Sequence, residues 1–325
     1  MNTAPRARVA RRPVHGVLLL DKPLGWSSND VLQKVKWLLR AEKAGHTGTL
    51  DPLASGVLPL CFGAATKFSQ IQLEADKTYS ATLALGRTTT TGDAEGDTLQ
   101  VRPVCVTPDD VRRIQPQFLG EIHQTPPMHS ALKHQGRPLY AYARAGQTVE
   151  RAVRSVKIYA LNLALVHTDS APAAIEMIVT CSKGTYVRTL AEDLGEALGC
   201  GAHLSRLRRL DTGGLNVADA ISLDDLTALD EDQRLARLKP VDVLLREQTR
   251  VTLGPQDAAR FLSGLRRRGA WVDTPAAAVY ATDGALLGSA RIGAGELIPV
   301  RLLSPPEIQQ IKAQATEKPT SALCA

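Results

Sequence analysis

Two side chains able to do acid–base or nucleophilic chemistry lie close together in a glycine-rich stretch, Gly45–Leu58. They are His46 and Asp51. Three glycines in this stretch permit backbone conformations closed to other residues, and they let a substrate approach the main chain. For an isolated Asp-Pro pair, capping a turn is the commoner role of the aspartate. The case for chemistry at Asp51 therefore depends on what the rest of the chain places beside it.

Two further motifs favour a functional role. Tyr79 ends the run Lys77-Thr78-Tyr79, which places an aromatic ring among polar neighbours on a predicted strand. Tyr186 and Arg188 lie at the predicted start of a helix. The ordinary alternatives are strand packing for Tyr79 and a surface charge for Arg188.

Alternating and helical patterns predict the elements that hold these residues. Val14–Leu20 reads as a buried strand, and a helix capped by Ser27 or Ser28 follows it. Gly45–Gly63 is rich in Gly and Pro and predicts an ordered loop. Lys77–Leu85 alternates apolar and polar residues, as a half-buried strand does.

The second half of the chain predicts a sheet, a helix and a separate small domain. Val153–Val166 and Ile175–Cys181 alternate as neighbouring strands. A helix with a buried stripe follows and ends before Gly199. From Val251 onward, short apolar runs broken by glycines predict a small β-rich domain.

Charge is segregated along the 325 residues, which carry 39 Lys and Arg against 33 Asp and Glu, a net charge of +6. Residues 1–50 hold the whole excess, and the other 275 residues are neutral overall. That remainder has basic blocks at 133–157, 206–209 and 260–268 and an acidic block at 219–232. Such blocks favour a polyanion partner, although a solvated face is the commoner role of a charge run.

Composition excludes several other classes of protein. No apolar run approaches the roughly 20 residues that span a bilayer, and the basic start lacks the apolar region of a secretory signal. Five scattered cysteines without C-x-x-C spacing argue against a disulfide framework or a zinc site. Neither a Walker A motif nor a dinucleotide fingerprint occurs. We therefore expect a cytoplasmic protein with no metal and no cofactor.

Taken together, the motifs resemble the TruB family of tRNA pseudouridine synthases. The resemblance covers residues 14–250 in order, and its most specific part is GHTGTLDP at 45–52. His129 stands where the family has tyrosine, and residues 1–13 lie outside the resemblance. The matching segments are GHTGTLDPLASGVLPLCFGAATKFSQ (45–70), KTY (77–79), TGDAEGD (91–97), the SALK…GRPLYAYARAG stretch (130–146), SKGTYVRTLAEDLG (182–195) and LRRLDTGG (207–214).

The resemblance implies an α+β fold, in which a pseudouridine synthase catalytic domain has a mixed, mostly antiparallel sheet. It also implies a small β-rich, PUA-like C-terminal domain. The expected division is a flexible basic N-terminus (1–13), the catalytic domain (14–250) with an RNA-binding thumb insertion at about 124–152, the PUA-like domain (251–304) and a flexible tail (305–325).

The implied reaction is isomerisation of uridine to pseudouridine at position 55 in the T-arm of tRNA, without cofactor or metal. The target base is flipped out, its N1–C1′ bond breaks, and C5 bonds to C1′. Asp51 matches the catalytic aspartate, and Arg188 matches the arginine that pairs with it and orients it. Attack at C1′, attack at uracil C6 and deprotonation at C2′ all stay open.

The resemblance also implies roles for the surrounding residues. Tyr79 would lie against the target base, and Tyr186 and Leu207 would line its pocket, although a core position is as common for such a leucine. His46 would meet the RNA backbone or the displaced base pair. The residues expected at the RNA backbone are Lys22, Lys67, Lys133, Arg137 and Arg144.

The expected partner is the T-arm of tRNA, bound by a monomer with neither a membrane nor a guide RNA. Two alternatives stay open. One is a guide-RNA-directed synthase, which the insertion at 124–146 disfavours because guided relatives delegate target choice to partners. The other is a tRNA-folding chaperone in which binding, and not chemistry, is the main activity.

Overall fold

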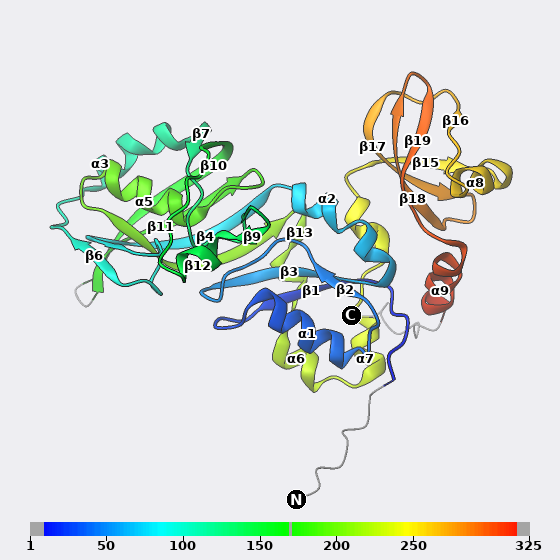
Figure 1. Ribbon diagram of the computed structural model, residues 1–325, viewed down its shortest axis with the longest axis horizontal. Coiled ribbons are helices and arrows are strands. Elements are labelled where there is room, and N and C mark those ends of the chain that lie inside the picture. Colours follow the sequence, from blue (N-terminus) through cyan, green and yellow to red (C-terminus); the bar gives the residue numbers. More distant parts are fainter. Residues whose placement is uncertain (1–9, 169–170, 317–325) are drawn as a thin grey trace, which may run out of the picture.

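A mixed sheet runs through the larger, N-terminal part of the computed structural model, which describes residues 10–168 and 171–316 (Figure 1). Its strand order is β14-β1-β3-β12-β4-β11-β10-β7, with β2 paired to β3 and β13 paired to β12. The strands are β1 (Gly16–Lys22), β2 (Ala44–His46), β3 (Ala54–Phe62), β4 (Lys77–Leu85), β7 (Gly120–Gln124), β10 (Arg154–Thr168), β11 (Ala171–Cys181), β12 (Ala202–Thr212), β13 (Leu215–Asn216) and β14 (Ile221–Ser222).

Most neighbours in this sheet are antiparallel, whereas β1 with β14 and β3 with β12 are parallel. The predicted mixed, mostly antiparallel sheet is therefore confirmed. The predicted loop over Gly45–Gly63 is wrong, because residues 44–46 and 54–62 form β2 and β3. β3 lies between β1 and β12, so nearly all of its residues are buried, and a continuously buried strand lacks the alternation that marks an exposed one.

Helices cover the sheet at both of its ends (Figure 1). α1 (Ser28–Leu38), α6 (Leu223–Ala228) and α7 (Glu231–Ala236) lie together against the β1 end. α3 (Pro108–Ile114) and α5 (Val187–Ala197) share a core cluster with β4, β10 and β11 at the opposite end. The predicted cap of α1 is confirmed, since the Ser27 side chain accepts a hydrogen bond from the backbone of Asp30.

Smaller elements connect these layers. Thr107 caps α3 with a capping box. The remaining elements are α2 (Ser69–Glu74), α4 (Leu139–Ala143), β5 (Arg87–Thr89), β6 (Thr98–Val101), β8 (Lys133–His134), β9 (Arg137–Pro138), and the 3₁₀ helices η1 (Gly63–Lys67), η2 (Gln115–Phe118), η3 (Val217–Asp219) and η4 (Val241–Leu245).

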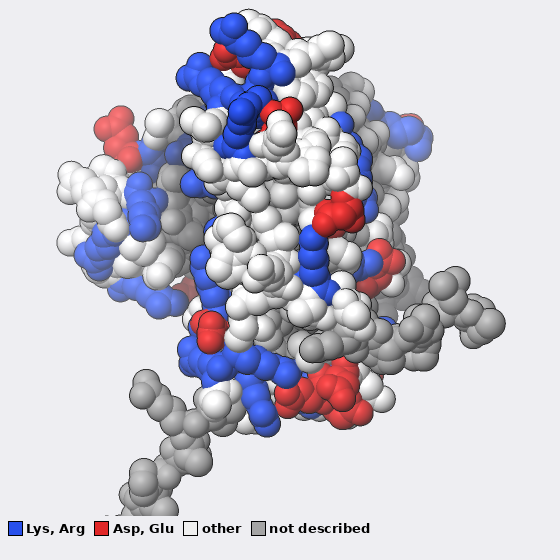
Figure 2. Space-filling model, turned by 90° about the vertical axis from the view of Figure 1, so that its right-hand side faces the viewer, with Lys and Arg blue, Asp and Glu red and all other residues white. Residues whose placement is uncertain are grey.

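The predicted C-terminal β-rich domain is confirmed. Its sheet has the order β15-β17-β18-β19-β16, and α8 and α9 accompany it. On the face in Figure 2, Lys and Arg side chains gather over the top of this domain, above a largely uncharged area. The elements are β15 (Thr249–Leu253), β16 (Arg267–Arg268), β17 (Thr274–Ala281), β18 (Leu286–Gly293), β19 (Glu296–Leu302), α8 (Pro255–Leu262) and α9 (Pro305–Thr316).

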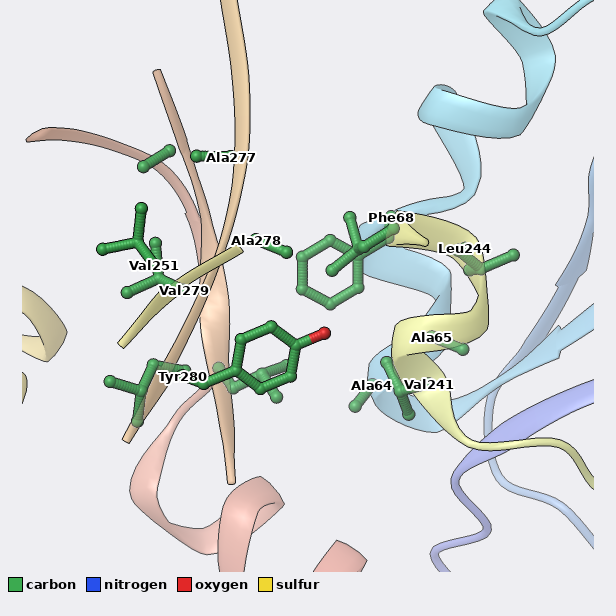
Figure 3. Close-up of a cluster of buried hydrophobic side chains, with 14 of the residues drawn as sticks. Ala64, Ala65, Phe68, Val241, Leu244, Val251, Ala277, Ala278, Val279 and Tyr280 are labelled. Carbon is green, nitrogen blue, oxygen red and sulfur yellow. The ribbon is translucent and has the colours of Figure 1, made fainter. Parts of the chain in front are cut away.

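One apolar cluster joins the two domains (Figure 3). The ring of Phe68 lies between Ala278 of β17 and Leu244 of η4. The Tyr280 hydroxyl donates a hydrogen bond to Asp242 at 3.2 Å. Because this cluster is continuous, burial of apolar area holds the C-terminal domain against the mixed sheet.

Both predicted flexible ends differ from the structure where it describes them. Residues 305–316 form α9, in which Gln314 bonds the backbone of His15 and Gln310 bonds its ring. The Arg12 side chain forms an ion pair with Glu231 at 2.7 Å, and the Arg12 backbone forms an isolated β-bridge with Ala41. These contacts join segments far apart in the chain, which local composition does not reveal. The rest of both predicted ends, 1–9 and 317–325, lies outside the described residues.

Within residues 10–168 and 171–316, no helix combines the length and the apolar character needed to cross a membrane.

Candidate active site

Asp51 lies on the loop between β2 and β3, at a cavity of about 290 Å³. Tyr79 of β4, Tyr186 and Arg188 at the start of α5, and Leu207 of β12 line the same cavity. Five of the six residues predicted for catalysis or base binding therefore meet at one place, although they come from four different elements.

The Asp51 loop is tethered on both sides by the segment that enters α1. The Ser28 hydroxyl donates to the Leu50 carbonyl and accepts from the Leu50 N–H, at 2.9 and 2.8 Å. The Gly25 N–H donates to the Pro52 carbonyl at 2.9 Å. Backbone bonds immediately before and after Asp51 thus restrict where its carboxylate lies.

Arg188 is the centre of the charge network. Its guanidinium contacts the Asp51 carboxylate at 3.0 Å and the Asp93 carboxylate at 3.4 Å. It also donates to the carbonyls of Thr91 at 3.2 Å and His129 at 2.6 Å. The Arg188 side chain is 9% exposed and that of Asp51 is 44% exposed. One nitrogen of the buried Arg188 guanidinium thus contacts the Asp51 carboxylate, which stays open to the cavity, while the other contacts Asp93.

Asp93 is a site residue that motif reasoning did not single out, although the segment 91–97 was among the matching motifs. It is buried, and its carboxylate accepts from the Thr91 hydroxyl and the Glu95 N–H. Burial raises the pKa of Glu95, and the negative charges of Asp93 and Asp51 add to that rise. The signal available in the sequence was an acidic residue between Gly92 and Gly96. Its partner Arg188, however, lies 95 positions further along the chain.

Arg209 is the second missed residue. On β12 it is 1% exposed, and its guanidinium donates to the Val57 carbonyl at 2.8 Å and the Gly48 carbonyl at 3.3 Å. Burial raises the pKa of the Tyr79 phenol, and the hydrogen-bonded Arg209 charge opposes that rise. The chain had shown only a basic cluster at 206–209, without indicating which arginine is buried.

Gly56 lets β3 approach β12 at this point. A Cβ at Gly56 would lie 2.2 Å from the carbonyl oxygen of Arg209, and its φ of +104° is one that side chains rarely tolerate. The glycine-rich stretch predicted a close backbone approach to a substrate. At Gly56 the close neighbour is the protein's own backbone.

Lys22, one of the residues predicted to contact the RNA backbone, is bound within the protein. It is fully buried, and its ammonium donates to the carbonyls of Pro23 and Trp26 at 2.9 and 2.7 Å. Burial lowers the pKa of Lys22 to about 8, and the nearby Asp51 charge partly opposes this. The ammonium holds a turn of its own chain, and this position disfavours the predicted contact with a phosphate.

Lys67, also predicted to contact the RNA backbone, has its partners within the protein too. Its ammonium pairs with Glu307 at 2.5 Å and donates to the Leu302 carbonyl at 3.0 Å. It therefore fastens η1 to the C-terminal domain and does not face the cavity. Its ion pair depends on α9, which sequence reasoning had treated as a tail.

His46 lies on β2, next to the Asp51 loop, and it is not among the residues that line the cavity. Burial lowers its pKa, and the Arg209 charge lowers it further, so the neutral imidazole is favoured. Its Nδ1 atom is buried without a hydrogen-bond partner in the described part of the chain. This position agrees with a binding role better than with proton transfer in the cavity.

The predicted thumb segment, residues 124–152, forms a small hairpin and the short helix α4. Its basic side chains Lys133, Arg137 and Arg144 are exposed. The Arg137 guanidinium lies 4.7 Å from the ring centre of Tyr142, and that of Arg144 lies 5.4 Å from the ring centre of Tyr140. Arg137 also donates a hydrogen bond to the Ala141 carbonyl at 2.7 Å, so the tyrosine rings and α4 hold these cations at the surface of the segment.

The thumb segment also contributes to the cavity wall. Ser130, Ala131 and Leu132 line the cavity. Backbone bonds from Leu139 to Leu132 and from Tyr140 to Ser130 fasten α4 to these wall residues. The exposed arginines and the cavity are therefore parts of one continuous structure.

Models of known families match the chain over most of its length. Residues 36–187 match the model "TruB family pseudouridylate synthase (N terminal domain)", and residues 188–246 match "tRNA pseudouridylate synthase B C-terminal domain".

Among curated proteins, the chain is 62% identical over 322 residues to tRNA pseudouridine synthase B of Verminephrobacter eiseniae, covering 98% of this chain and 97% of the relative. It is 57% identical over 305 residues to the protein of the same name from Ralstonia nicotianae, covering 92% and 97%.

Among solved structures, a chain of "Crystal Structure of a Cbf5-Nop10-Gar1 Complex" is similar with a TM-score of 0.66 and 27% identity, covering 89% of this chain and 84% of that one. A chain of "Structure of H/ACA RNP bound to a substrate RNA containing 2'-deoxyuridine" shares the fold, with a TM-score of 0.67, 24% identity and coverage of 90% and 86%.

Proposed function

The chain belongs to the TruB family of pseudouridylate synthases, which are isomerases, and we propose that it converts uridine to pseudouridine at position 55 in the T-arm of tRNA. The relatives' names support tRNA as the substrate. The observation that carries the proposal is the Asp51–Arg188 pair, 3.0 Å apart at the mouth of a cavity lined by Tyr79 and Leu207.

The first requirement is access to a base that is normally stacked. Flipping the uridine out of the T-loop costs a few kcal/mol, and contacts inside the protein must offset that cost. The cavity supplies two tyrosine rings, Tyr79 and Tyr186, and the apolar side chain of Leu207. Ring faces and an apolar wall suit a planar pyrimidine.

The chemistry then requires that the Asp51 carboxylate be held in a fixed orientation. Three routes stay open. If Asp51 attacks C1′, the N1–C1′ bond breaks with its electron pair on the uracil, the uracil turns over, and C5 displaces Asp51 from C1′. If Asp51 adds to uracil C6, the uracil turns over while bound to it, and the bond to Asp51 breaks by elimination after C5 has bonded to C1′. If Asp51 takes the C2′ proton, the N1–C1′ bond breaks to leave a C1′–C2′ double bond, and the proton returns to C2′ as C5 bonds to C1′. In every route C5 then loses its proton. In each case Arg188 orients the carboxylate, and the Tyr79 phenol offers a route for the C5 proton.

Binding of the surrounding RNA falls to the thumb segment. Lys133, Arg137 and Arg144 contact phosphates of the T-arm, while the shape of the folded loop selects the substrate. His46 contacts the RNA beside the cavity. The same proposal assigns residues 14–250 to the catalytic domain and residues 251–304 to a PUA-like domain.

A guide RNA is not part of this proposal. The solved structures of similar fold carry titles that name protein complexes or an RNP, whereas the relatives that match nearly the whole chain carry the tRNA enzyme's name. The thumb segment supports stand-alone recognition, because it joins its exposed cations directly to the cavity wall.

Incubation of the purified full chain with an unmodified T-arm hairpin, without any guide RNA, tests the proposal. Pseudouridine should form at the target position, and a hairpin with cytidine there should give no product. The Asp51→Asn variant should bind the hairpin and form no product, which separates chemistry from a chaperone-like binding activity. An inactive wild-type protein under these conditions would refute the proposal.

A further inference from the structure

An exposed apolar turn stands beside the catalytic loop and has no role in the chemistry described above. It comprises residues 23–26, in which Leu24 is 64% exposed and Trp26 is 39% exposed. Single exposed apolar side chains are common on protein surfaces and need no explanation. This turn differs in two ways. Only Gly25 separates its two apolar residues, and hydrogen bonds hold its backbone in place.

Three sets of contacts hold the turn. The buried Lys22 ammonium bonds the carbonyls of Pro23 and Trp26, at its two ends. The Gly25 N–H bonds the Pro52 carbonyl, and the Ser28 hydroxyl bonds both backbone groups of Leu50. Trp26 therefore lies between two tethers to the residues on either side of Asp51. A preorganised side chain loses little conformational freedom when a ligand binds it.

The turn's chemistry suits a nucleobase and not a phosphate. Lys22 is the one basic residue in the segment 21–30, and it is buried. Asp21 is already paired with Arg208 at 2.7 Å. Residues 23–26 therefore offer apolar surface and an indole ring with no cation of their own, and the partly exposed Arg208 beside them is paired with Asp21. Unpaired bases stack on such rings whatever their sequence.

The target uridine is not the base in question, because neither Leu24 nor Trp26 is among the residues that line the Asp51 cavity. We propose that the 23–26 turn is a stacking surface for an unpaired nucleobase adjacent to the flipped uridine, with Trp26 supplying the ring face. This inference rests on the proposed function, since it needs an RNA whose target base enters the cavity.

Trp37 provides a matched control. It is also exposed, at 61%, but lies at the other end of α1, roughly 16 Å along the helix from Trp26. The inference predicts that Trp26→Ala raises KM for the hairpin by about 5- to 100-fold, with kcat changed less than about twofold, because a stacked neighbouring base contributes binding energy alone. Trp26→Phe should stay within about threefold of wild type, and Trp37→Ala should match wild type.

A second measurement identifies the partner. Hairpins with an abasic site on the 5′ or the 3′ side of the target uridine are combined with wild type and with Trp26→Ala. If Trp26 stacks on one of these bases, the Trp26→Ala penalty disappears with the hairpin that lacks that base. Tryptophan fluorescence should also be quenched by the intact hairpin in wild type and in Trp37→Phe, and this quenching should be lost in Trp26→Phe.

The outcomes separate the two proposals. A wild-type protein without activity overturns the proposed function itself. An active wild type whose Trp26→Ala variant keeps the wild-type KM overturns only the stacking surface. Penalties that persist with both abasic hairpins also overturn it, because the loss would then not come from a neighbouring base.

Discussion

The Asp51 cavity and the thumb segment use the same side chain, arginine, in opposite ways. Arg188 and Arg209 are buried, and their donors are occupied by carboxylates and carbonyls of the protein. Arg137 and Arg144 are exposed and rest on tyrosine rings. A buried charge that loses one partner is costly, whereas an exposed charge contributes little by itself. We infer that arginine sets geometry in the cavity and affinity in the thumb segment.

The largest effect should follow from Arg188→Lys. Lysine keeps the charge but lacks the fork that reaches Asp51 and Asp93 together, so the carboxylate loses its orientation. We expect kcat to fall by roughly 10²- to 10⁴-fold, with a small change in KM, in single-turnover and steady-state assays. Arg206→Lys, at an exposed position on β12, is the control. Equal rates for the two variants would remove the contrast between buried and exposed arginines.

The second-largest effect should follow from Gly56→Ala, which tests how closely β3 must pack against β12. The new Cβ would press on the Arg209 backbone at 2.2 Å, so we expect a loss of about 3 kcal/mol or more in unfolding free energy by urea denaturation. Gly136→Ala in the thumb segment is the control, because its φ is also positive, at +81°, and nothing lies within 4 Å of its Cβ. Its expected loss is about 1 kcal/mol. Similar losses of unfolding free energy would mean that the Asp51 cavity and the thumb segment tolerate a new side chain equally well.

Neutralising the thumb should weaken binding and leave the chemistry intact. For Arg137→Gln combined with Arg144→Gln, we expect hairpin affinity to fall about tenfold at low salt. The slope of log Kd against log salt should decrease by about 1 to 2, as two phosphate contacts require. Arg112→Gln with Arg113→Gln, on exposed arginines of α3 that pair with aspartates, is the control. A salt slope that stays at the wild-type value would count against the thumb assignment.

The smallest effect concerns Glu192 of α5, beneath the loop that carries Asp93. Burial, and then the charge of Asp193, raise the pKa of Glu192 to about 7. Because its pKa in the folded state lies above its ordinary value, ionisation costs stability as pH rises from about 4.5 to about 7. Glu192→Gln should therefore stabilise the protein by about 1 kcal/mol at pH 8, since partial exposure screens the penalty, and by much less at pH 4.5. Urea denaturation at both pH values checks this, with the more exposed Glu196→Gln as the control.

Some of the candidate site was predictable because it depends on neighbours in the chain. Asp51, Tyr79, Tyr186, Arg188 and Leu207 were named from their motifs, and the structure brings all five to one cavity. Asp93 and Arg209 were missed because their place in the site depends on an ion pair and hydrogen bonds with residues far away in sequence. Lys22 and Lys67 were given surface roles, since a lysine is rarely buried and nothing local revealed their partners.

The same division holds for the fold. The alternation of β4 and the cap at Ser27 were predicted from the sequence, because they involve residues two to four positions apart. β3 and α9 were not, because a central strand and a docked helix owe their stability to segments distant in the chain. Sequence alone thus identified the Asp51 loop and the chemistry proposed for it. Tertiary structure decided which cations are buried, and burial turns an arginine into a fixed part of the site.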